Sequence, residues 1–279
     1  EFKLMKKPVC TIILNRNLPD VTDKLYENIY NHNKEFTDIY VVEGGSDKNR
    51  LSKYATWHAD WDDAIKNGLR YSRGMNYALD NLLQENKFKN YESFLLLTND
   101  TEFSEKPFIK DLYDIINKHE RLAILSPCCP SWGEKYLLEK NSLKYFWFIH
   151  SDALLIKREF IEETYSQEKP GYMNFLFDGS NFRGYCAESE LIAKAYNNYW
   201  AAAITSKIWS IENESHLIDK HELIKTESDE ENKRIYVEEG FKWMYRKYGF
   251  KSKWSMHMYV KALYDKFFIN YPELKKYQI

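Results

Sequence analysis

Short runs of apolar and β-branched residues alternate with longer amphipathic stretches through the first half of the chain. The runs have the length and composition of buried strands, and they span residues 8–14, 38–42, 94–97 and 122–125. The stretches between them repeat apolar residues at helical spacing, over residues 18–33, 71–83 and 106–118. This alternation is typical of βαβ units, so we predict an α/β fold with a mainly parallel sheet.

The second half of the chain has a different pattern and predicts a mixed sheet. Two short strands are expected there, followed by a loop-rich region and then by helices with many aromatic residues. The strands are predicted at 145–150 and 153–156, the loops at 167–184, and the helices at 188–200, 228–248 and 254–268.

Composition excludes several classes of protein. The 279 residues include 40 Lys and Arg against 42 Asp and Glu, a net charge of −2, so no strong positive field favours nucleic acid as a partner. No run approaches about 18 consecutive apolar residues and no signal-peptide pattern is present, so we expect a soluble, cytoplasmic protein. The four cysteines lack a Cys-x-x-Cys pair and are expected to be reduced thiols in the core. The glycine-rich phosphate loops of kinases and dinucleotide-binding dehydrogenases are absent.

Polar residues follow the predicted strands at the points where the strands end. Asp100 follows the third apolar run, and Glu43 follows the second. Asn15 and Arg16 follow the first. Ligands bind outside the carboxyl ends of strands in open α/β sheets, so these side chains are candidates to line a ligand pocket. A carboxylate such as Asp100 suits Mg²⁺ or Mn²⁺ held against phosphate oxygens; the alternative is that Asn99-Asp100 only forms a turn.

Two acids stand at the start of the helix predicted at 188–200. Glu188 and Glu190 lie in the segment Tyr185-Cys186-Ala187-Glu188-Ser189-Glu190-Leu191. One of them could act as a general base that removes a proton from a hydroxyl. The alternative is plain compensation of the helix dipole, which favours carboxylates at a helix N-terminus.

Six segments, taken in order, resemble the successive motifs of inverting GT-A glycosyltransferases of family 2. The segments are VCTIILNRN, DIYVVEGGSD, RYSRGMNYAL, FLLLTNDTEF, GYCAESELIAKAY and ENESH. They cover about residues 8–216. A weaker similarity to the rhamnosyltransferase-like members continues to Lys247-Tyr248-Gly249.

The resemblance implies a GT-A type fold, with a mixed, mainly parallel nucleotide-binding sheet flanked by helices and a C-terminal helical extension. The catalytic domain would span residues 3–220. Within it, residues 3–127 would bind the nucleotide sugar and residues 128–220 the acceptor. The helical extension would span residues 221–279.

The resemblance also assigns the central residues of the site. Glu43 falls on the acid that contacts the nucleotide base. Asp100 falls on the metal-binding acid of an Asp-x-Asp motif whose first position is Thr98 in this chain. Glu188 falls on the catalytic base. Both central aspartates of the family's Glu-Asp-x-Asp-Leu motif are glutamates here, at 188 and 190, which lengthens the reach of each carboxylate by a methylene.

Five further residues receive roles by the same resemblance. His216 is placed at the metal or diphosphate, although a lone loop histidine also has many other uses. Arg73 and Asn99 are placed with Asn15 and Arg16 in the nucleotide-binding set. Asp152 and Glu190 are placed on the acceptor side.

The function implied by the resemblance is metal-dependent transfer of a sugar, with inversion, from a nucleoside-diphosphate sugar to a hydroxyl of a glycan or lipid-linked acceptor. The cofactor would be Mn²⁺ or Mg²⁺, and polysaccharide biosynthesis is the expected setting. One alternative is a non-catalytic GT-A-like module for glycan binding or assembly. Another is a nucleotidyltransferase, which is disfavoured because the first strand lacks a glycine- and lysine-rich loop after it.

The C-terminal stretch combines aromatic residues with lysines and leaves three hypotheses open. Its helices are expected to close the core, since apolar helical faces usually bury within protein. The other hypotheses are a homodimer interface and peripheral contact with the inner face of a membrane that carries a lipid-linked acceptor.

Overall fold

The computed structural model describes residues 6–150, 153–165 and 169–279. The strands within these ranges are β1 Val9–Asn15, β2 Thr37–Glu43, β3 Ala55–His58, β4 Ser93–Thr98, β5 Thr101–Phe103, β6 Leu122–Cys128, β7 Leu143–Tyr145, β8 Ala153–Lys157 and β9 Ala201–Glu212. The α-helices are α1 Pro19–Asn33, α2 Asp62–Asn67, α3 Arg70–Gln84, α4 Ile109–Lys118, α5 Arg158–Thr164, α6 Ala187–Asn197, α7 Ser215–Asp219, α8 Asp229–Tyr248 and α9 Lys253–Asn270. Short 3₁₀ turns lie at Lys48–Arg50, Phe88–Asn90, Gly133–Leu137 and Pro272–Tyr277.

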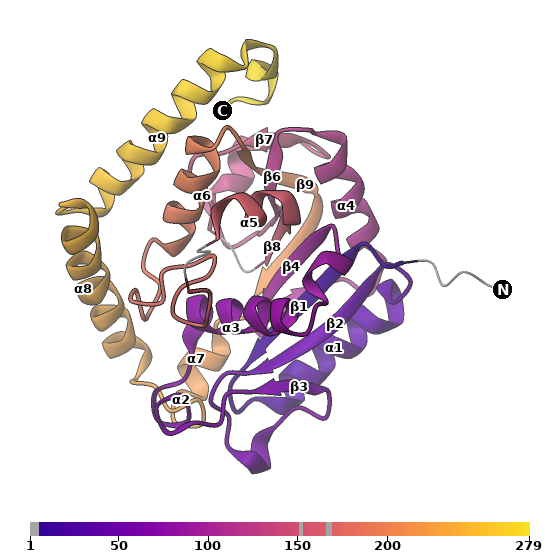
Figure 1. Ribbon diagram of the computed structural model, residues 1–279, viewed down its shortest axis with the longest axis vertical. Coiled ribbons are helices and arrows are strands. Elements are labelled where there is room, and N and C mark those ends of the chain that lie inside the picture. Colours follow the sequence, from indigo (N-terminus) through magenta and orange to yellow (C-terminus); the bar gives the residue numbers. More distant parts are fainter. Residues whose placement is uncertain (1–5, 151–152, 166–168) are drawn as a thin grey trace.

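In the described part of the chain these strands form one nine-stranded sheet in the order β3-β2-β1-β4-β8-β6-β9-β5, with β7 also paired to β9 (Figure 1). The strands β3, β2, β1 and β4 are parallel, whereas β8 runs antiparallel to both β4 and β6. Helices flank the sheet, so the architecture is the predicted mixed α/β fold.

The order of the strands creates a topological switch next to β1. The chain leaves β1 for β2 on one side through α1, and it later enters β4 on the other side of β1 after α3. Right-handed crossovers in opposite directions place α1 and α3 on opposite faces of the sheet, and both helices contact β1. The register sets Asn15 beside Glu43 and Leu14 beside Thr98, so three strands end at one level. A crevice opens at such a point.

Several elements differ from the sequence-based expectation. The strand predicted at 145–150 is wrong beyond Tyr145, where β7 ends. The Phe146 amide still donates to the Ala202 carbonyl at 2.9 Å, but the His150 amide donates to Glu134 Oε1 at 3.0 Å and draws the chain out of the ladder. Strand β9 was not predicted because its start is a run of three alanines, which shows no alternation of polar and apolar residues.

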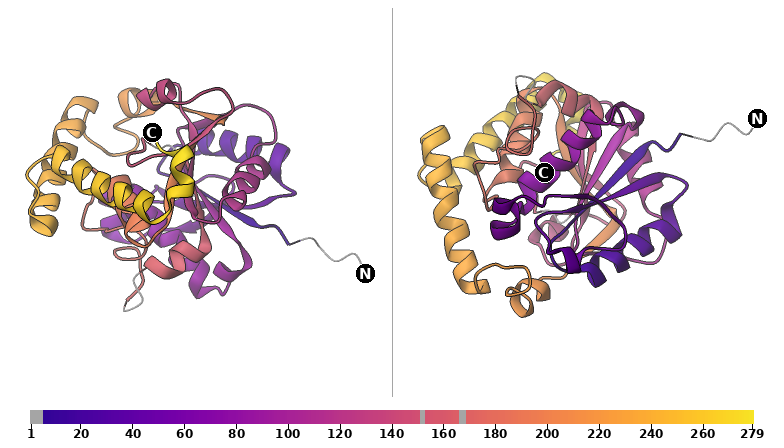
Figure 2. Two further views of the ribbon diagram at one scale, coloured as in Figure 1. Left: turned by 90° about the horizontal axis from the view of Figure 1, so that it is seen from above. Right: turned by 60° about the horizontal axis from the view of Figure 1, so that its bottom comes forward.

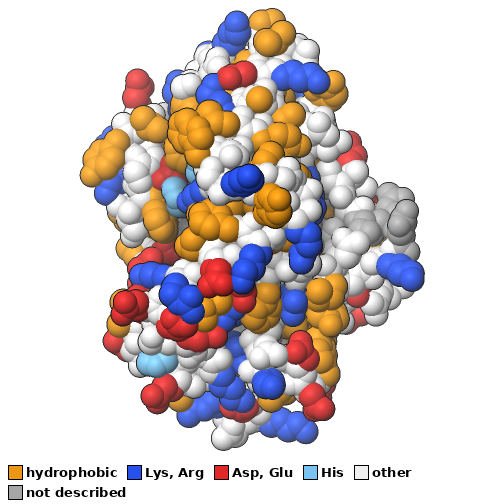
Figure 3. Space-filling view, turned by 90° about the vertical axis from the view of Figure 1, so that its left-hand side faces the viewer, with side chains coloured by type: hydrophobic (Ala, Val, Ile, Leu, Met, Phe, Trp, Pro, Cys, Tyr) orange, Lys and Arg blue, Asp and Glu red, His pale blue; other side chains and the backbone are white. Residues whose placement is uncertain are grey.

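The C-terminal helices α8 and α9 run along the left-hand and upper side of the molecule in Figure 1, and α8 lies at the left edge in both views of Figure 2. Helix α9 packs on α6. Its inner face is buried and consists of Met256, Val260, Tyr264, Phe267 and Phe268. On the outer face of this side of the molecule, charged side chains crowd the lower half and hydrophobic ones are more numerous in the upper half (Figure 3).

This arrangement agrees with the expectation that the C-terminal helices close the core. In the part of the chain that the structure describes, no helix is both long and apolar enough to span a membrane. All four cysteines are free and buried, as expected.

Helix α8 packs against the loop that precedes α6, and Gly240 lies at the point of contact. A Cβ atom built at Gly240 would stand 2.3 Å from Cβ of Tyr185, a separation that real side chains do not adopt. Gly240 therefore permits the close approach of α8 to Tyr185, two residues before the start of α6.

Replacing this glycine should loosen the attachment of α8. We expect Gly240→Val to lower the free energy of unfolding by about 2 kcal/mol, because the cost of overpacking exceeds the gain in helix propensity. The control is Gly133→Val, where an added Cβ meets no atom within 4 Å. Urea unfolding followed by tryptophan fluorescence measures both variants; equal midpoints would refute the close-packing argument.

Candidate functional site

One asparagine joins the ends of three neighbouring strands. Asn15, the last residue of β1, donates from Nδ2 to Glu43 Oε2 at 2.9 Å. Its Oδ1 accepts from Asn99 Nδ2, also at 2.9 Å. Asn99 follows β4 directly and donates as well to Thr22 Oγ1 of α1 at 3.2 Å. Three of the predicted nucleotide-binding residues therefore meet at the topological switch.

The carboxylate of Glu43 is fully buried and already has protein partners. Besides Asn15, it accepts from Ser46 Oγ at 2.5 Å and from the Ser52 amide at 2.8 Å. These bonds fold the loop after β2 back onto the strand ends. In this structure Glu43 joins the ends of β1 and β2 and the loop that follows β2, and its contact with a nucleotide base stays a prediction.

A pocket of ≈ 180 Å³ opens beside this junction. It is lined by five of the residues singled out from the sequence, together with one arginine that was not. The five are Asn15, Arg16, Asn99, Asp100 and His216, and the additional residue is Arg70.

The pairing of β5 with β9 brings Asp100 and His216 to the same pocket. Thr101 pairs with Glu212, and the Asn213 amide donates to the Asp100 carbonyl at 2.9 Å. The chain then turns into α7, which carries His216. Residues separated by more than a hundred positions thus face one cavity.

Polar atoms of these two residues are buried without a hydrogen-bond partner in the described structure: Oδ1 of Asp100 and both ring nitrogens of His216. An unsatisfied buried polar group costs about 1–3 kcal/mol, so such atoms gathered in one pocket indicate a ligand that satisfies them. A carboxylate oxygen and an imidazole nitrogen are donors that Mn²⁺ accepts.

The pKa shift of His216 fits a role as a metal ligand. Burial, with the charge of Lys220, lowers the pKa of His216, so the imidazole is neutral at pH 7 and can offer a lone pair. Burial raises the pKa of Asp100. No group of three or more His, Cys, Asp or Glu side chains placed to hold a metal occurs among the described residues. A divalent ion here would therefore complete its shell with phosphate oxygens and water.

Two arginines form another wall of the pocket. Arg16 donates from Nη2 to the carbonyls of Ile65 and Lys66, at 3.2 and 3.1 Å. Burial and the neighbouring charge of Arg70 lower the pKa of Arg16 to about 10, so it stays positively charged at pH 7. The Nε atoms of Arg16 and Arg70 are both buried without a partner. Two cations at this depth suit a diphosphate.

Two arginines at the start of α3, Arg70 and Arg73, have different surroundings. Arg70 has a left-handed backbone, with φ of 55°, and lines the pocket. Arg73, the residue predicted to touch the donor, instead donates to the Gly179 carbonyl at 2.8 Å and lies 4.6 Å from the Phe182 ring. The sequence offered a signal for Arg70, a second arginine one helical turn before Arg73, but spacing alone does not say which of the two faces the pocket.

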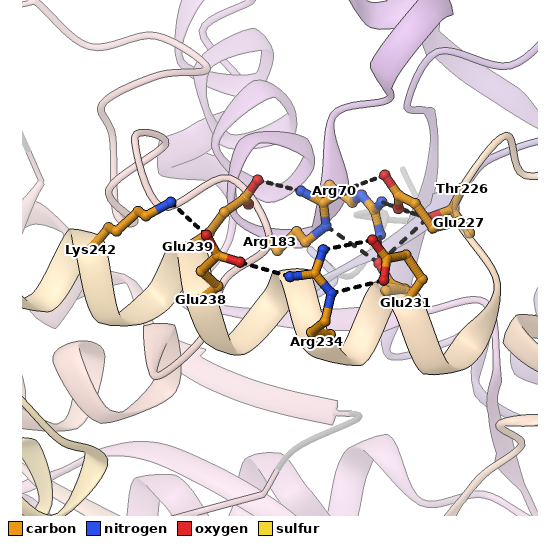
Figure 4. A network of polar contacts seen from close by, with 10 residues as sticks. Arg70, Arg183, Thr226, Glu227, Glu231, Arg234, Glu238, Glu239 and Lys242 are labelled. Carbon is orange, nitrogen blue, oxygen red and sulfur yellow. Dashed lines mark hydrogen bonds and ion pairs between the residues drawn. The ribbon is translucent and has the colours of Figure 1, made fainter.

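Arg70 also anchors the chain between α7 and α8 (Figure 4). It donates to Thr226 Oγ1 at 2.7 Å and forms an ion pair with Glu227 at 3.6 Å. Arg183, mostly buried, pairs with Glu227 at 2.6 Å and with Glu239 of α8 at 2.5 Å. This network holds the first turns of α8 beside the pocket that Thr226 lines.

The predicted base lies in a second, smaller pocket of ≈ 50 Å³. Glu188 is half-buried in the first turn of α6, and its carboxylate has no side-chain hydrogen bond within the described ranges. Burial raises the pKa of Glu188, while its own amide and the charges of His150 and Lys253 oppose that shift. A free carboxylate with a raised pKa is a better proton acceptor than an ordinary surface acid.

The second acid of this segment is engaged differently. Glu190 is 3% exposed, forms an ion pair with Lys247 at 2.6 Å and accepts from the Tyr248 hydroxyl. The Lys247-Tyr248 pair noted in the sequence therefore fastens the end of α8 to α6. Asp152, the other predicted acceptor-side residue, lies outside the described residues.

The pocket of Glu188 also contains a tyrosine that was not predicted. Tyr236 of α8 lines this pocket. Burial, together with the negative charge of Glu188, raises the pKa of Tyr236, so its phenol is neutral at pH 7.

No family model and no curated protein matches this chain. Solved structures do. A mannosyltransferase from Pyrobaculum calidifontis, solved with GDP-Man and Mn²⁺, aligns at a TM-score of 0.48 and 12% identity over 78% of this chain and 59% of that one. GalNAc-T7, solved with UDP, GalNAc and Mn²⁺, aligns at a TM-score of 0.55 and 10% identity over 88% of this chain and 57% of that one. The fold is of GT-A type. The chain spans less than two thirds of either structure.

Mn²⁺ binding should depend on the two residues with unsatisfied atoms. We expect Asp100→Asn and His216→Gln each to weaken Mn²⁺ binding by about tenfold or more, measured by electron paramagnetic resonance of the free ion with and without a nucleoside diphosphate. Because the pKa of Asp100 is raised, the wild type should release Mn²⁺ on acidification at a higher pH than an ordinary aspartate site would. Asp114→Asn, an exposed acid on α4, is the control. Equal affinities in all four proteins would remove Asp100 and His216 from the metal site.

Proposed function

We propose that the protein is a glycosyltransferase that moves a sugar from a nucleoside-diphosphate sugar to a hydroxyl of a glycan or lipid-linked acceptor, with metal dependence and inversion. The observation that carries the proposal is the set of unsatisfied atoms of Asp100 and His216 in a pocket at the topological switch. The GT-A fold supports it, and GalNAc-T7, which shares this fold, was solved with UDP, GalNAc and Mn²⁺. Assembly of a polysaccharide in the cytoplasm is the setting we propose.

The donor would lie in the ≈ 180 Å³ pocket. Arg16 and Arg70 would bind its phosphates and balance their charge, while the Asn15 and Asn99 junction would hold the strand ends that face the nucleoside. Asp100 and His216 would hold Mn²⁺ or Mg²⁺, which when bound supplies positive charge to the leaving diphosphate. Arg73 has no contact with this pocket and is not part of the proposed donor site.

The acceptor hydroxyl would lie at Glu188. Glu188 accepts the hydroxyl proton as the oxygen forms its bond to the anomeric carbon from the face opposite the diphosphate. The bond from that carbon to the phosphate oxygen breaks, and its electron pair leaves with the nucleoside diphosphate. Because the entering and leaving oxygens occupy opposite faces, the anomeric configuration inverts.

The competing function is a non-catalytic module that keeps the fold and binds a glycan. The observation that favours it is that Glu190, one of the two acids of this segment, is occupied by Lys247 and Tyr248. Membrane contact and dimer formation through α9 are not part of the proposal, because the inner apolar face of that helix is buried in the protein.

A thermal-shift panel of nucleoside diphosphates and nucleotide sugars, each with and without Mn²⁺ or Mg²⁺, tests the donor site. A ligand at about 100 times its Kd should stabilise the protein by roughly 2.7 kcal/mol. We expect a metal-dependent shift with one nucleotide that is lost in Asp100→Asn. If no nucleotide shifts the melting temperature, the transferase proposal fails and the glycan-binding module is favoured.

Once a donor is found, its slow hydrolysis tests the base. We expect Glu188→Gln to lower the rate by about a hundredfold or more while leaving nucleotide binding unchanged, because a positioned base contributes about 10²–10⁴-fold. Glu159→Gln, an exposed acid on α5, is the matched control. A Glu188→Gln rate equal to that of the wild type would assign the base elsewhere.

A further inference from the structure

We propose that the C-terminal helix α9 completes the acceptor site: Lys253 and His257 form a wall of the Glu188 pocket, and the Lys253 ammonium favours the ionised form of the Glu188 carboxylate. This inference deepens the proposed function and rests on it for the role of Glu188 as a base. It makes Lys253 a positioning residue that acts through Glu188.

The placement of the two residues follows from helix geometry. Lys253 and His257 are four positions apart on α9, so their side chains leave the same face of the helix. The helix start is defined by Ser252, whose side chain accepts a hydrogen bond from the Ser255 amide at 3.2 Å. Both residues line the pocket that contains Glu188.

The docking of α9 fixes this wall in place. The buried side chains of its inner face pack against α6, the helix that carries Glu188. The Tyr264 hydroxyl donates to the Tyr145 carbonyl at 3.1 Å, and the Ile279 amide donates to the Tyr264 oxygen at 2.9 Å. The base and the two α9 residues therefore belong to one packed unit.

Among the titratable groups that line the Glu188 pocket, Lys253 is the one whose positive charge can act on Glu188. The groups that face the pocket are His150 from the loop after β7, Cys186 and Glu188 itself at α6, Tyr236 from α8, and Lys253 and His257 from α9. Tyr236 and Cys186 are neutral at pH 7, because burial raises the pKa of each. Burial, with the charges of Lys253 and His150, lowers the pKa of His257 to about 4, so it is neutral as well.

Besides Lys253, His150 is the other group at the pocket that can carry a positive charge, and it already has an acidic partner. His150 Nδ1 lies 2.6 Å from Glu134 Oε1, so any positive charge on that ring is balanced there. Lys253 forms no ion pair within the described ranges, and its Nζ lies 5.6 Å from the centre of the Tyr185 ring. Lys253 therefore lines the pocket with a charge that no carboxylate partner among the described residues neutralises.

The consequence concerns how a partly buried acid can act as a base at neutral pH. Burial disfavours the charged carboxylate, and an opposite charge within about 4–6 Å lowers a carboxyl pKa by roughly 1–3 units. Lys253 opposes the effect of burial on the Glu188 pKa, and no ion pair joins the two residues within the described ranges, which leaves the carboxylate oxygens open to a hydroxyl. The neutral His257 adds a polar wall that does not compete for the proton.

The test measures the ionisation of Glu188 in the full chain without any substrate. Infrared difference spectra, each referenced to the matching Glu188→Gln protein, follow the protonated carboxyl band through a pH titration. We expect Lys253→Met to raise the Glu188 pKa by about one unit or more, and Lys253→Arg to keep it near the wild-type value. Lys251→Met, which removes an exposed lysine two positions away, should leave it unchanged.

The outcomes separate this inference from the proposed function. An unchanged Glu188 pKa in Lys253→Met, or an equal shift in Lys251→Met, overturns the role of Lys253 whether or not the protein transfers sugar. If Lys253→Met does not fold, Lys253→Gln and the retention of the wild-type value in Lys253→Arg decide the matter. Where donor hydrolysis is measurable, the acidic limb of its pH profile should move upward with the same variant, while absent hydrolysis in the wild type bears on the proposed function alone.

Discussion

The hydrogen bonds of Asn15 hold together the point on which the site depends. Strands β1, β2 and β4 end at one level, and the polar side chains buried at these ends need hydrogen-bond partners. Asn15 links Glu43 to Asn99, and Glu43 in turn fixes the loop that follows β2. Without a side chain that both donates and accepts at position 15, the Glu43 carboxylate would lose a donor and the Asn99 amide an acceptor. The pocket with Asp100 and His216 opens from this junction.

A second constraint is that about sixty residues after α7 both cover the core and supply residues to the two pockets. The chain after α7 returns to Arg70 at the ≈ 180 Å³ pocket, α8 brings Tyr236 to the pocket of Glu188, and α9 brings Lys253 to that same pocket. Ion pairs in which Arg183 and Glu190 are the buried partners hold these segments in position. Removing one partner of such a pair leaves a buried charge, so the C-terminal helices and the two pockets are energetically coupled.

The electrostatic design separates two kinds of carboxylate. Oδ1 of Asp100 and the carboxylate of Glu188 accept no hydrogen bond from another side chain in the part of the chain that the structure describes, and burial raises the pKa of each. Glu43 and Glu190 are more deeply buried, and protein donors occupy them. Four acids of similar chemistry thus divide into two that can meet a ligand and two that maintain the geometry around them.

The sequence by itself determined the α/β class, the positions of β1, β2, β4 and β6, and several of the polar residues that line the pocket, because apolar periodicity and the polar residues after strands are local features. It also pointed to Glu188, Asp100 and His216 through the order of its motifs. Only the tertiary structure decided that Arg70 rather than Arg73 lines the pocket, that Glu190 is engaged by Lys247 and Tyr248, and that Lys253 and Tyr236 join Glu188. These outcomes depend on which face of a helix meets a distant segment, and side-chain packing across long sequence separations leaves no local pattern.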